Sequence, residues 1–259
     1  MVTNGEEKGS RSIRALEIVE ALVKEGRPLS AAKIADVTGL PKATVHRLCA
    51  LLTETGFVAP VPTGEGLGVG PRLRDLAMAT VAVDLDHGQR HRILTDLSQE
   101  IGETCNFNIP VGGEMYYIDR VETKWPLRTQ LPIGSRVPLH CTASGKLYLA
   151  SLPSGRRRQM IQALDLTPHT PGTITDPAEL LANLESIRRN KVGTDNQEFI
   201  EGMVAVAVPV TDAKGRLAGT LACHGPTVRM SMEMAQSFIP ALRRAAAKLS
   251  QVGGEEAAE

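Results

Sequence analysis

The chain has 259 residues, of which 42% are hydrophobic and 22% charged, so it can bury a substantial core and is long enough for two domains. Aromatic residues make up only 3%, which argues against a base-stacking binder of RNA or single strands, and the net charge of +0 excludes a grossly basic, non-specific nucleic-acid binder. The cysteines are scattered, the polar start is unlike a signal peptide, and no apolar run is long enough to cross a membrane. Together these features predict a cytoplasmic protein with reduced thiols and no membrane partner.

A first amphipathic helix is predicted from Ser10, a possible cap, to about Lys24. Its buried stripe is expected to consist of apolar residues at helical spacing, namely Ile13, Leu16, Val19 and Val23. The break at residues 26–28 separates it from the next two helices, and we expect the three to form one helical core.

Residues 30–57 predict two short helices joined by a tight turn. Ser30 can cap the first helix, and Ile34 and Val37 give it an apolar face. Gly39 suits the position just past a helix end, where φ is often positive, and Pro41 suits the first position of the next helix, which needs no N–H donor. This is the layout of a helix-turn-helix.

The second of these helices is the candidate DNA-reading element. Its inward face is predicted to be Val45, Leu48, Cys49 and Leu52. The residues on the outer face, together with the preceding cap, are the candidate DNA contacts: Ser30, Lys42, Ala43, Thr44, His46 and Arg47. The alternative is a plain helical hairpin whose outer face is only solvated.

Residues 58–70 hold two prolines and four glycines and predict a short β-hairpin, the wing of a winged helix. A phosphate-binding glycine loop is the competing interpretation. It fails because the glycines simply alternate and no strand–turn–helix unit surrounds them. The segment Pro71–Val83 then predicts a connecting helix that also touches a partner chain.

The remaining 84–252 predict an α+β domain with helices on one side of its sheet. Asp84, Thr142 and Asp176 are expected helix caps. Helices are predicted over 85–101, from 142, and over 156–164, 177–190 and 230–252. Strands are predicted within 104–131 and over 193–199, 203–210 and 216–223.

Three blocks of the sequence resemble the IclR family of bacterial transcription regulators: IADVTGLPKATVHRLCALLTETGFV, PLHCTASGKLYLA and DNQEFIEGMVAVAVPVTDAKGRLAGTLACHGP. The resemblance covers nearly the whole chain. It implies a winged helix-turn-helix domain (10–70), a linker helix (71–83) and a GAF-like effector and oligomerisation domain (84–252) whose antiparallel sheet is flanked by helices. It further implies dimers or tetramers that bind double-stranded operator DNA, small organic or aromatic acids as effectors, and no cofactor.

The effector site is expected at the helix start after Thr142, because free backbone N–H groups and the helix dipole there suit a carboxylate. By position in the family's blocks, further residues should line the same pocket. The full predicted set is Thr142, Ala143, Ser144, Asp195, Met203, Ala205, Ala222 and His224. A His224 ring protonated near neutral pH would add a charge-assisted bond. The alternative is that Ala205 and Ala222 are core residues and Asp195 caps a loop.

Two departures from the family pattern are visible. The wing has no Lys or Arg between Phe57 and Pro71 and carries Glu65, so its phosphate contacts should be weak. The strand before Gly225 ends in His224 where small polar residues are common, which changes the pocket.

The cysteines and histidines allow two other hypotheses, a metal-binding sensor or a small-molecule hydrolase. A metal site would need the convergence of Cys105, His140, Cys141, Cys223 and His224, which lack recurrent ligand spacing. A hydrolase would use Cys141 or Ser144 as nucleophile and His140 or His224 as base, within hydrogen-bond reach of each other. His140 is a poor partner for Cys141, because adjacent residues on a strand point to opposite faces. We therefore predict a ligand-responsive DNA-binding regulator with no metal and no catalytic site.

Overall fold

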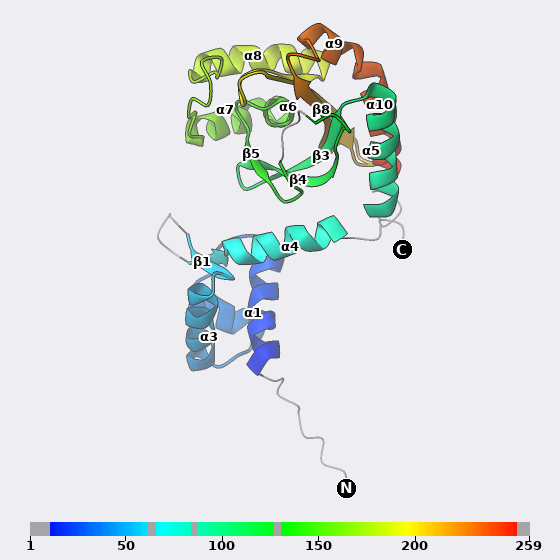
Figure 1. Cartoon of the computed structure of the whole chain (residues 1–259). Coiled ribbons are helices and arrows are strands. Elements are labelled where there is room, and N and C mark those ends of the chain that lie inside the picture. The colour runs from blue at the N-terminus through cyan, green and yellow to red at the C-terminus, as the bar shows by residue number, and fades with distance from the viewer. Residues whose placement is uncertain (1–10, 62–65, 84–86, 127–130, 253–259) are drawn as a thin grey trace. The chain divides into compact units, whose positions relative to one another are not determined.

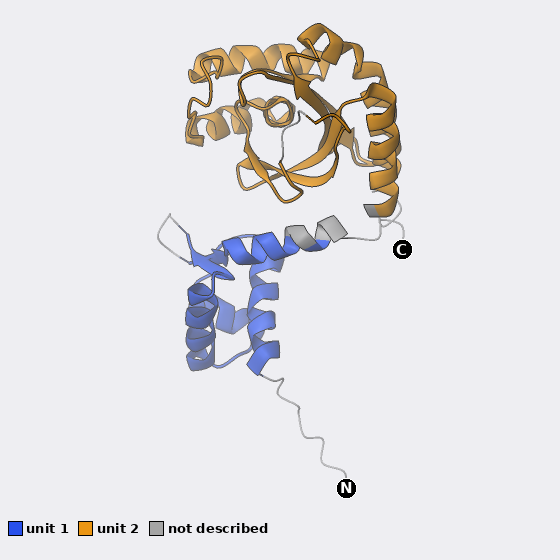
Figure 2. Cartoon of the chain, in the orientation of Figure 1, with its two compact units in different colours: residues 1–80 blue, residues 81–259 orange. Residues whose placement is uncertain are grey.

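The computed structural model describes residues 11–61, 66–83, 87–126 and 131–252. The chain divides into two compact units, Met1–Thr80 and Val81–Glu259 (Figure 2). The division falls inside the connecting helix α4, Pro71–Val83, whose bounds match the prediction.

The first unit is three helices followed by a two-stranded hairpin (Figure 1). Its elements are α1 (Arg11–Glu25), α2 (Ala31–Thr38), α3 (Lys42–Glu54), β1 (Val58–Pro60) and β2 (Leu67–Val69). Two of the predicted local signals are confirmed, whereas Pro41 is the N-cap residue of α3, one position before its first helical residue, Lys42. The Ser30 hydroxyl accepts from the Lys33 amide at 3.2 Å, and Gly39 has φ +67°.

The buried face of α1 differs from the predicted stripe. Ile13, Leu16 and Val23 are 48%, 56% and 58% exposed, and the helix buries Ile18, Ala21 and Leu22 instead. Val19, the fourth residue of the predicted stripe, does pack against the helical core, together with the half-buried Ala15. Val37 of α2, also predicted to face inward, is 44% exposed.

The wing hairpin is present and antiparallel, with Val58 opposite Val69. Leu29, just before α2, pairs with Leu67 and ties the hairpin to the helical core. Gly70 is required where the chain leaves the wing, because a Cβ there would collide with the backbone of Gly56. The predicted cap Ser10 and the wing residue Glu65 lie outside the described residues.

The second unit is built on a six-stranded sheet in the order β5-β4-β3-β8-β7-β6, with every neighbouring pair antiparallel. The strands are β3 (Thr104–Val111), β4 (Glu114–Val121), β5 (Arg136–Pro138), β6 (Gly193–Asn196), β7 (Met203–Thr211) and β8 (Leu217–Pro226). The predicted strand at 127–131 falls mostly outside the described residues. The described elements confirm the predicted α+β class.

Helices cover both faces of this sheet, so the prediction of helices on one side is wrong. One face packs against α5 (His87–Ile101) and α10 (Ile239–Val252). The other packs against α6 (Ala143–Ser151), and α8 (Pro177–Asn190) packs on α6 and also contacts α7 (Ser154–Ala163). The cause is the composition of β7, which presents valines to one face and alanines to the other, so that both faces are apolar.

The predicted closing helix is two helices. α9 (Met232–Ser237) ends at Phe238, and α10 starts at Ile239. Pro240 is the reason, because proline has no N–H to donate to the preceding turn and is tolerated only in the first turn of a helix. Within the described part of the chain, no helix has the length and apolar character needed to span a membrane.

Candidate functional site

All eight residues predicted for the effector site line one cavity of about 40 Å³ in the second unit. The pairing register of the sheet brings the distant ones together. Asp195 lies opposite Ala205, and Ala205 lies opposite His224. Directly opposed residues on antiparallel strands are near neighbours, so three strands deliver these side chains to one place.

The start of α6 forms one wall of the cavity. Thr142 caps the helix, because its hydroxyl accepts from the Gly145 amide at 3.1 Å and its carbonyl accepts from the Lys146 amide at 2.9 Å. The amides of Ala143 and Ser144 precede these and have no acceptor within the helix. They and the positive end of the helix dipole make this wall suited to an anion.

The position of α6 depends on glycine at two close approaches. A Cβ on Gly145 would collide with the backbone of Leu139, and one on Gly193 in β6 would collide with the carbonyl of Ala143. These contacts set the first turn of α6 directly against the sheet edge.

A polar wall stands on β3. Asn106 and Asn108 are buried and both line the cavity, and the Asn108 amide nitrogen donates to the Ser144 hydroxyl at 2.8 Å. The Asn108 Oδ1 atom is buried, and no described residue donates to it. A buried acceptor without a donor is costly, so this oxygen favours a ligand or water that can donate.

His224 is held by an arginine that the sequence analysis did not include. Arg120 Nη1 lies 3.0 Å from His224 Nε2 and 2.8 Å from Asn106 Oδ1. Guanidinium can only donate, so His224 Nε2 accepts and its proton sits on Nδ1. Burial and the neighbouring Arg120 charge lower the pKa of His224 to about 3. The expectation of a protonated ring is therefore wrong, and a neutral ring presents one N–H.

Asp195 both lines the cavity and caps a turn. Its Oδ1 accepts from the Glu198 amide at 2.8 Å and more weakly from the Phe199 amide at 3.4 Å. Burial, opposed by the bond from the Glu198 amide, raises the pKa of Asp195 to about 7. Its carboxyl group is thus near half protonation at neutral pH.

The cysteines and histidines considered together in the sequence analysis occupy separate places. Cys105 and Cys223 face each other across β3 and β8 in the core beside α5 and α10, whereas His224 lines the cavity. His140 and Cys141 lie in bends and not in a strand, so the argument that they point to opposite faces does not hold. Burial raises the pKa of the Cys141 thiol to about 12, which disfavours a nucleophilic thiolate.

The predicted DNA-reading face is on α3. Lys42, Ala43, His46 and Arg47 are exposed and Thr44 is half-buried, while the opposite face of α3 is buried in the helical core. Ser30, also exposed, caps α2. The exposed face carries two cationic side chains and an imidazole, which suits contact with phosphates and base edges.

These features define a class of protein: a helix-turn-helix unit with a hairpin wing, joined by a helix to an α+β unit that contains a small polar cavity. The chain belongs to the IclR family of bacterial transcriptional regulators. The model described as the IclR helix-turn-helix domain matches residues 13–62, and the model described as the bacterial transcriptional regulator IclR C-terminal domain matches residues 79–251.

Named relatives agree with this assignment. The chain is 43% identical to a probable transcriptional regulator, SauR, of Cupriavidus necator. The match extends over 235 residues and covers 91% of this chain and 93% of the relative. A crystal structure of IclR from Thermotoga maritima matches with a TM-score of 0.63 and 28% identity, covering 93% and 97% of the two chains. Such relatives are named as transcription regulators and not as enzymes, and the protein is accordingly a transcriptional regulator.

A structure of the inducer-binding domain alone also matches. It is a double mutant of the transcription factor PobR from Acinetobacter in complex with 3-hydroxybenzoic acid. The match has a TM-score of 0.57 and 27% identity, and it covers 62% of this chain and 94% of that one.

Several residues of the cavity were missed by sequence reasoning, among them Asn106, Asn108, Tyr117 and Phe199, with Arg120 behind them. A signal existed for the two asparagines. They stand two apart in a strand, so they share a face, and two amides on one face of an otherwise apolar strand indicate a polar site.

Proposed function

We propose that the protein binds operator DNA through α3 and that a small organic or aromatic acid in the cavity changes its affinity for that DNA. The observation that carries the proposal is the start of α6, where Ala143 and Ser144 line a cavity with a polar opposite wall and their amides have no partner within the helix. A carboxylate would bind these amides, and the rest of the acid would meet Asn108 and His224. The relative crystallised with 3-hydroxybenzoic acid supports this class of ligand.

The proposed DNA contacts are Ser30, Lys42, Ala43, Thr44, His46 and Arg47. The proposed effector contacts are Thr142, Ala143, Ser144, Asp195, Met203, Ala205, Ala222 and His224. We place the boundaries at 10–70 for the DNA-binding domain, 71–83 for the linker helix and 84–252 for the effector domain.

We further propose a two-fold dimer, which can pair into a tetramer. Two recognition helices related by a two-fold axis favour a palindromic operator whose half-sites lie about one helical turn apart. A protein with chromosomal DNA as its target works in the cytoplasm. The effector acts only through a difference in its affinity for the DNA-competent and the incompetent states.

The test has two stages and uses the full chain. DNA fragments are selected from a random pool, and a thermal-shift screen of small carboxylic acids identifies binders, because a ligand specific to the folded state raises the melting temperature. The best acid is then added to a gel-shift titration on the selected DNA. A shift in apparent Kd supports the proposal. Binding of DNA with no response to any acid that raises the melting temperature contradicts it.

The first site prediction concerns His224. His224→Gln keeps an acceptor near the position of Nε2 for Arg120 but loses the Nδ1–H donor. We expect it to weaken acid binding roughly tenfold, because one hydrogen bond contributes about 1–1.5 kcal/mol. His224→Leu should lose the same contact and also lower the melting temperature, since it leaves Arg120 without this acceptor. Calorimetry with the identified acid makes the comparison, and equal affinity in wild type and His224→Gln would show that His224 only packs.

A second prediction is the pH dependence of acid binding. An ionised Asp195 repels a carboxylate in the same cavity. Burial and the nearby Glu198 carboxylate raise the pKa of Asp195 to about 7, while the nearby Lys146 ammonium and the turn amides that donate to Asp195 oppose this rise. Tyr117 also faces it and stays neutral, with a pKa raised by burial to about 12. Affinity should fall roughly tenfold between pH 6 and pH 8, as the protonated fraction falls from about nine-tenths to about one-tenth.

The matched variant for this prediction is Asp195→Asn, which cannot ionise. It should bind the acid with an affinity that changes little over the same pH interval. A wild-type profile as flat as that of Asp195→Asn would remove Asp195 from the site.

A further inference from the structure

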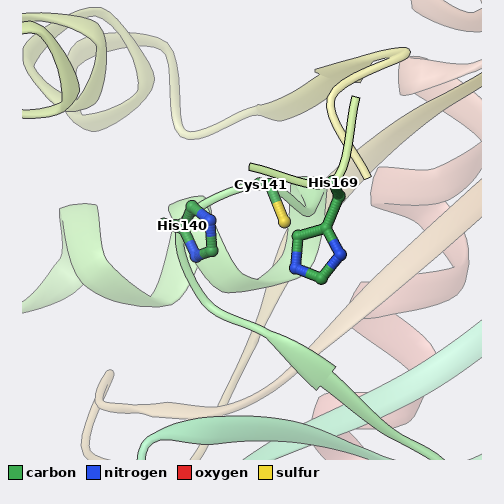
Figure 3. Close-up of side chains that lie close together, drawn as sticks. All are labelled: His140, Cys141 and His169. Atoms are coloured by element: carbon green, nitrogen blue, oxygen red, sulfur yellow. The ribbon is translucent and has the colours of Figure 1, made fainter. Parts of the chain in front are cut away.

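His140, Cys141 and His169 lie close together (Figure 3). They adjoin the cavity at Thr142, although none of the three lines it. Each offers one potential ligand atom, and these three atoms all lie within 4.8 Å of one another. His140 and Cys141 come from the bend before α6, and His169 comes from the loop between α7 and α8. His169 could not be grouped with Cys141 from the sequence, because 28 positions separate the two residues and only the fold brings them together.

The His140 imidazole is held in place by a hydrogen bond outside the cluster. His140 Nε2 lies 3.0 Å from the carbonyl of Thr167, which can only accept, so Nε2 donates and Nδ1 keeps a free lone pair. A histidine that donates its second N–H to a backbone carbonyl is the usual arrangement of a metal ligand.

The loop that carries His169 is also fixed. The His169 amide donates to the Thr173 hydroxyl at 3.0 Å, and that hydroxyl donates to the carbonyl of Glu198 at 2.6 Å. Thr170 makes a second such bond, to the carbonyl of Gln197 at 2.6 Å. The exposed side chain of His169 is therefore presented from an anchored backbone.

A metal ion can reach the cluster from solvent, because His169 is exposed while His140 and Cys141 are buried. A bound divalent ion would itself deprotonate the thiol.

We propose that His140, Cys141 and His169 bind a divalent transition-metal ion, with Zn²⁺ the best match. One thiolate and two neutral imidazoles form a ligand set of the borderline-soft type that zinc prefers, and three protein ligands leave the fourth tetrahedral position open to water or another ligand. The site adjoins the proposed effector cavity through Phe199. Its ring lies edge-on to His169 with the centroids 5.4 Å apart, and it lines the cavity.

The experiment is a titration of the full, metal-stripped chain with Co²⁺, which reports a thiolate ligand by a charge-transfer band and tetrahedral geometry by intense ligand-field bands. One Co²⁺ per chain with both signatures, displaced by Zn²⁺, is the expected result for the wild type. Cys141→Ser should lose the charge-transfer band. His169→Gln should bind Co²⁺ more than about a hundredfold more weakly, since even loss of an outer hydrogen bond to a ligand costs about 10–100-fold.

His169 is exposed, so His169→Gln should fold, and circular dichroism checks this. The matched control is His46→Gln, which removes another exposed histidine from the first unit and should leave Co²⁺ binding unchanged. A wild-type chain without the charge-transfer band would overturn the proposal. Equal Co²⁺ affinity in His169→Gln and His46→Gln would overturn it as well, because His169 would then be no ligand.

Discussion

Glu198→Ala is expected to lower the free energy of unfolding of the second unit by about 3–5 kcal/mol, because it leaves a buried ammonium group without its counter-ion. Lys146 in α6 is fully buried, and its Nζ lies 2.5 and 2.6 Å from the two carboxylate oxygens of Glu198. Trp125 is the chain's single tryptophan and belongs to the second unit, so its fluorescence during urea denaturation follows this unit alone.

Two further variants separate the pair's interaction from the loss of a side chain. The double variant Lys146→Met with Glu198→Leu removes both charges and should recover most of the lost stability, since a buried pair is often replaceable by apolar residues. Glu100→Ala breaks an ion pair with Arg244 in which both side chains are more than half exposed, and it should stay close to wild type. A Glu198→Ala chain as stable as Glu100→Ala would mean that Lys146 is solvated or neutral.

This pair also connects fold and site. Glu198 belongs to the turn capped by Asp195, and Lys146 follows the helix start that carries the free amides. The ion pair therefore fixes two walls of the cavity relative to each other. We therefore expect Glu198→Ala to lose part of its effector affinity as well. This affinity is measured under conditions in which the variant is still folded.

Local chemistry explains what could be predicted of the fold. The caps at Ser30, Thr142 and Asp176 accept from backbone amides three residues further on, as their side chains allow without help from the rest of the chain. The buried face of α1 could not be predicted, because two apolar stripes compete and the choice depends on the helices packed against it. The coverage of both sheet faces likewise follows from contacts far apart in sequence.

The candidate site likewise has a part that could be predicted from the sequence and a part that only the fold brings together. The helix-start pattern predicted three residues at the start of α6, and the family's blocks predicted five on strands that the pairing register gathers around the same cavity. Arg120 and His169 were missed because each meets its partner, His224 or Cys141, only through the pairing of distant segments. The charge of His224 was misjudged for the same reason, since burial beside Arg120 is invisible in the sequence.

Arg47→Ala is expected to weaken binding to the selected operator roughly thirtyfold or more. Arg47 is exposed on α3, one position before the buried Leu48, so its loss should not disturb the helical core. A bidentate contact to a base contributes about 1–3 kcal/mol, and a palindromic site loses it twice, so the total is about 2 kcal/mol or more. Fluorescence anisotropy with the selected duplex measures the effect.

Three comparisons make this result specific. The Arg47→Ala chain should bind a scrambled duplex almost as wild type does, because a base contact carries sequence information and a phosphate contact does not. Lys42→Ala, which removes the other cation of this face, should weaken binding to both duplexes and make the salt dependence shallower, as the loss of a phosphate contact does. Arg189→Ala on α8 of the second unit is the charge-matched control and should bind as wild type. If Arg47→Ala weakens both duplexes equally, Arg47 contacts phosphate and the base readout belongs to other residues of α3.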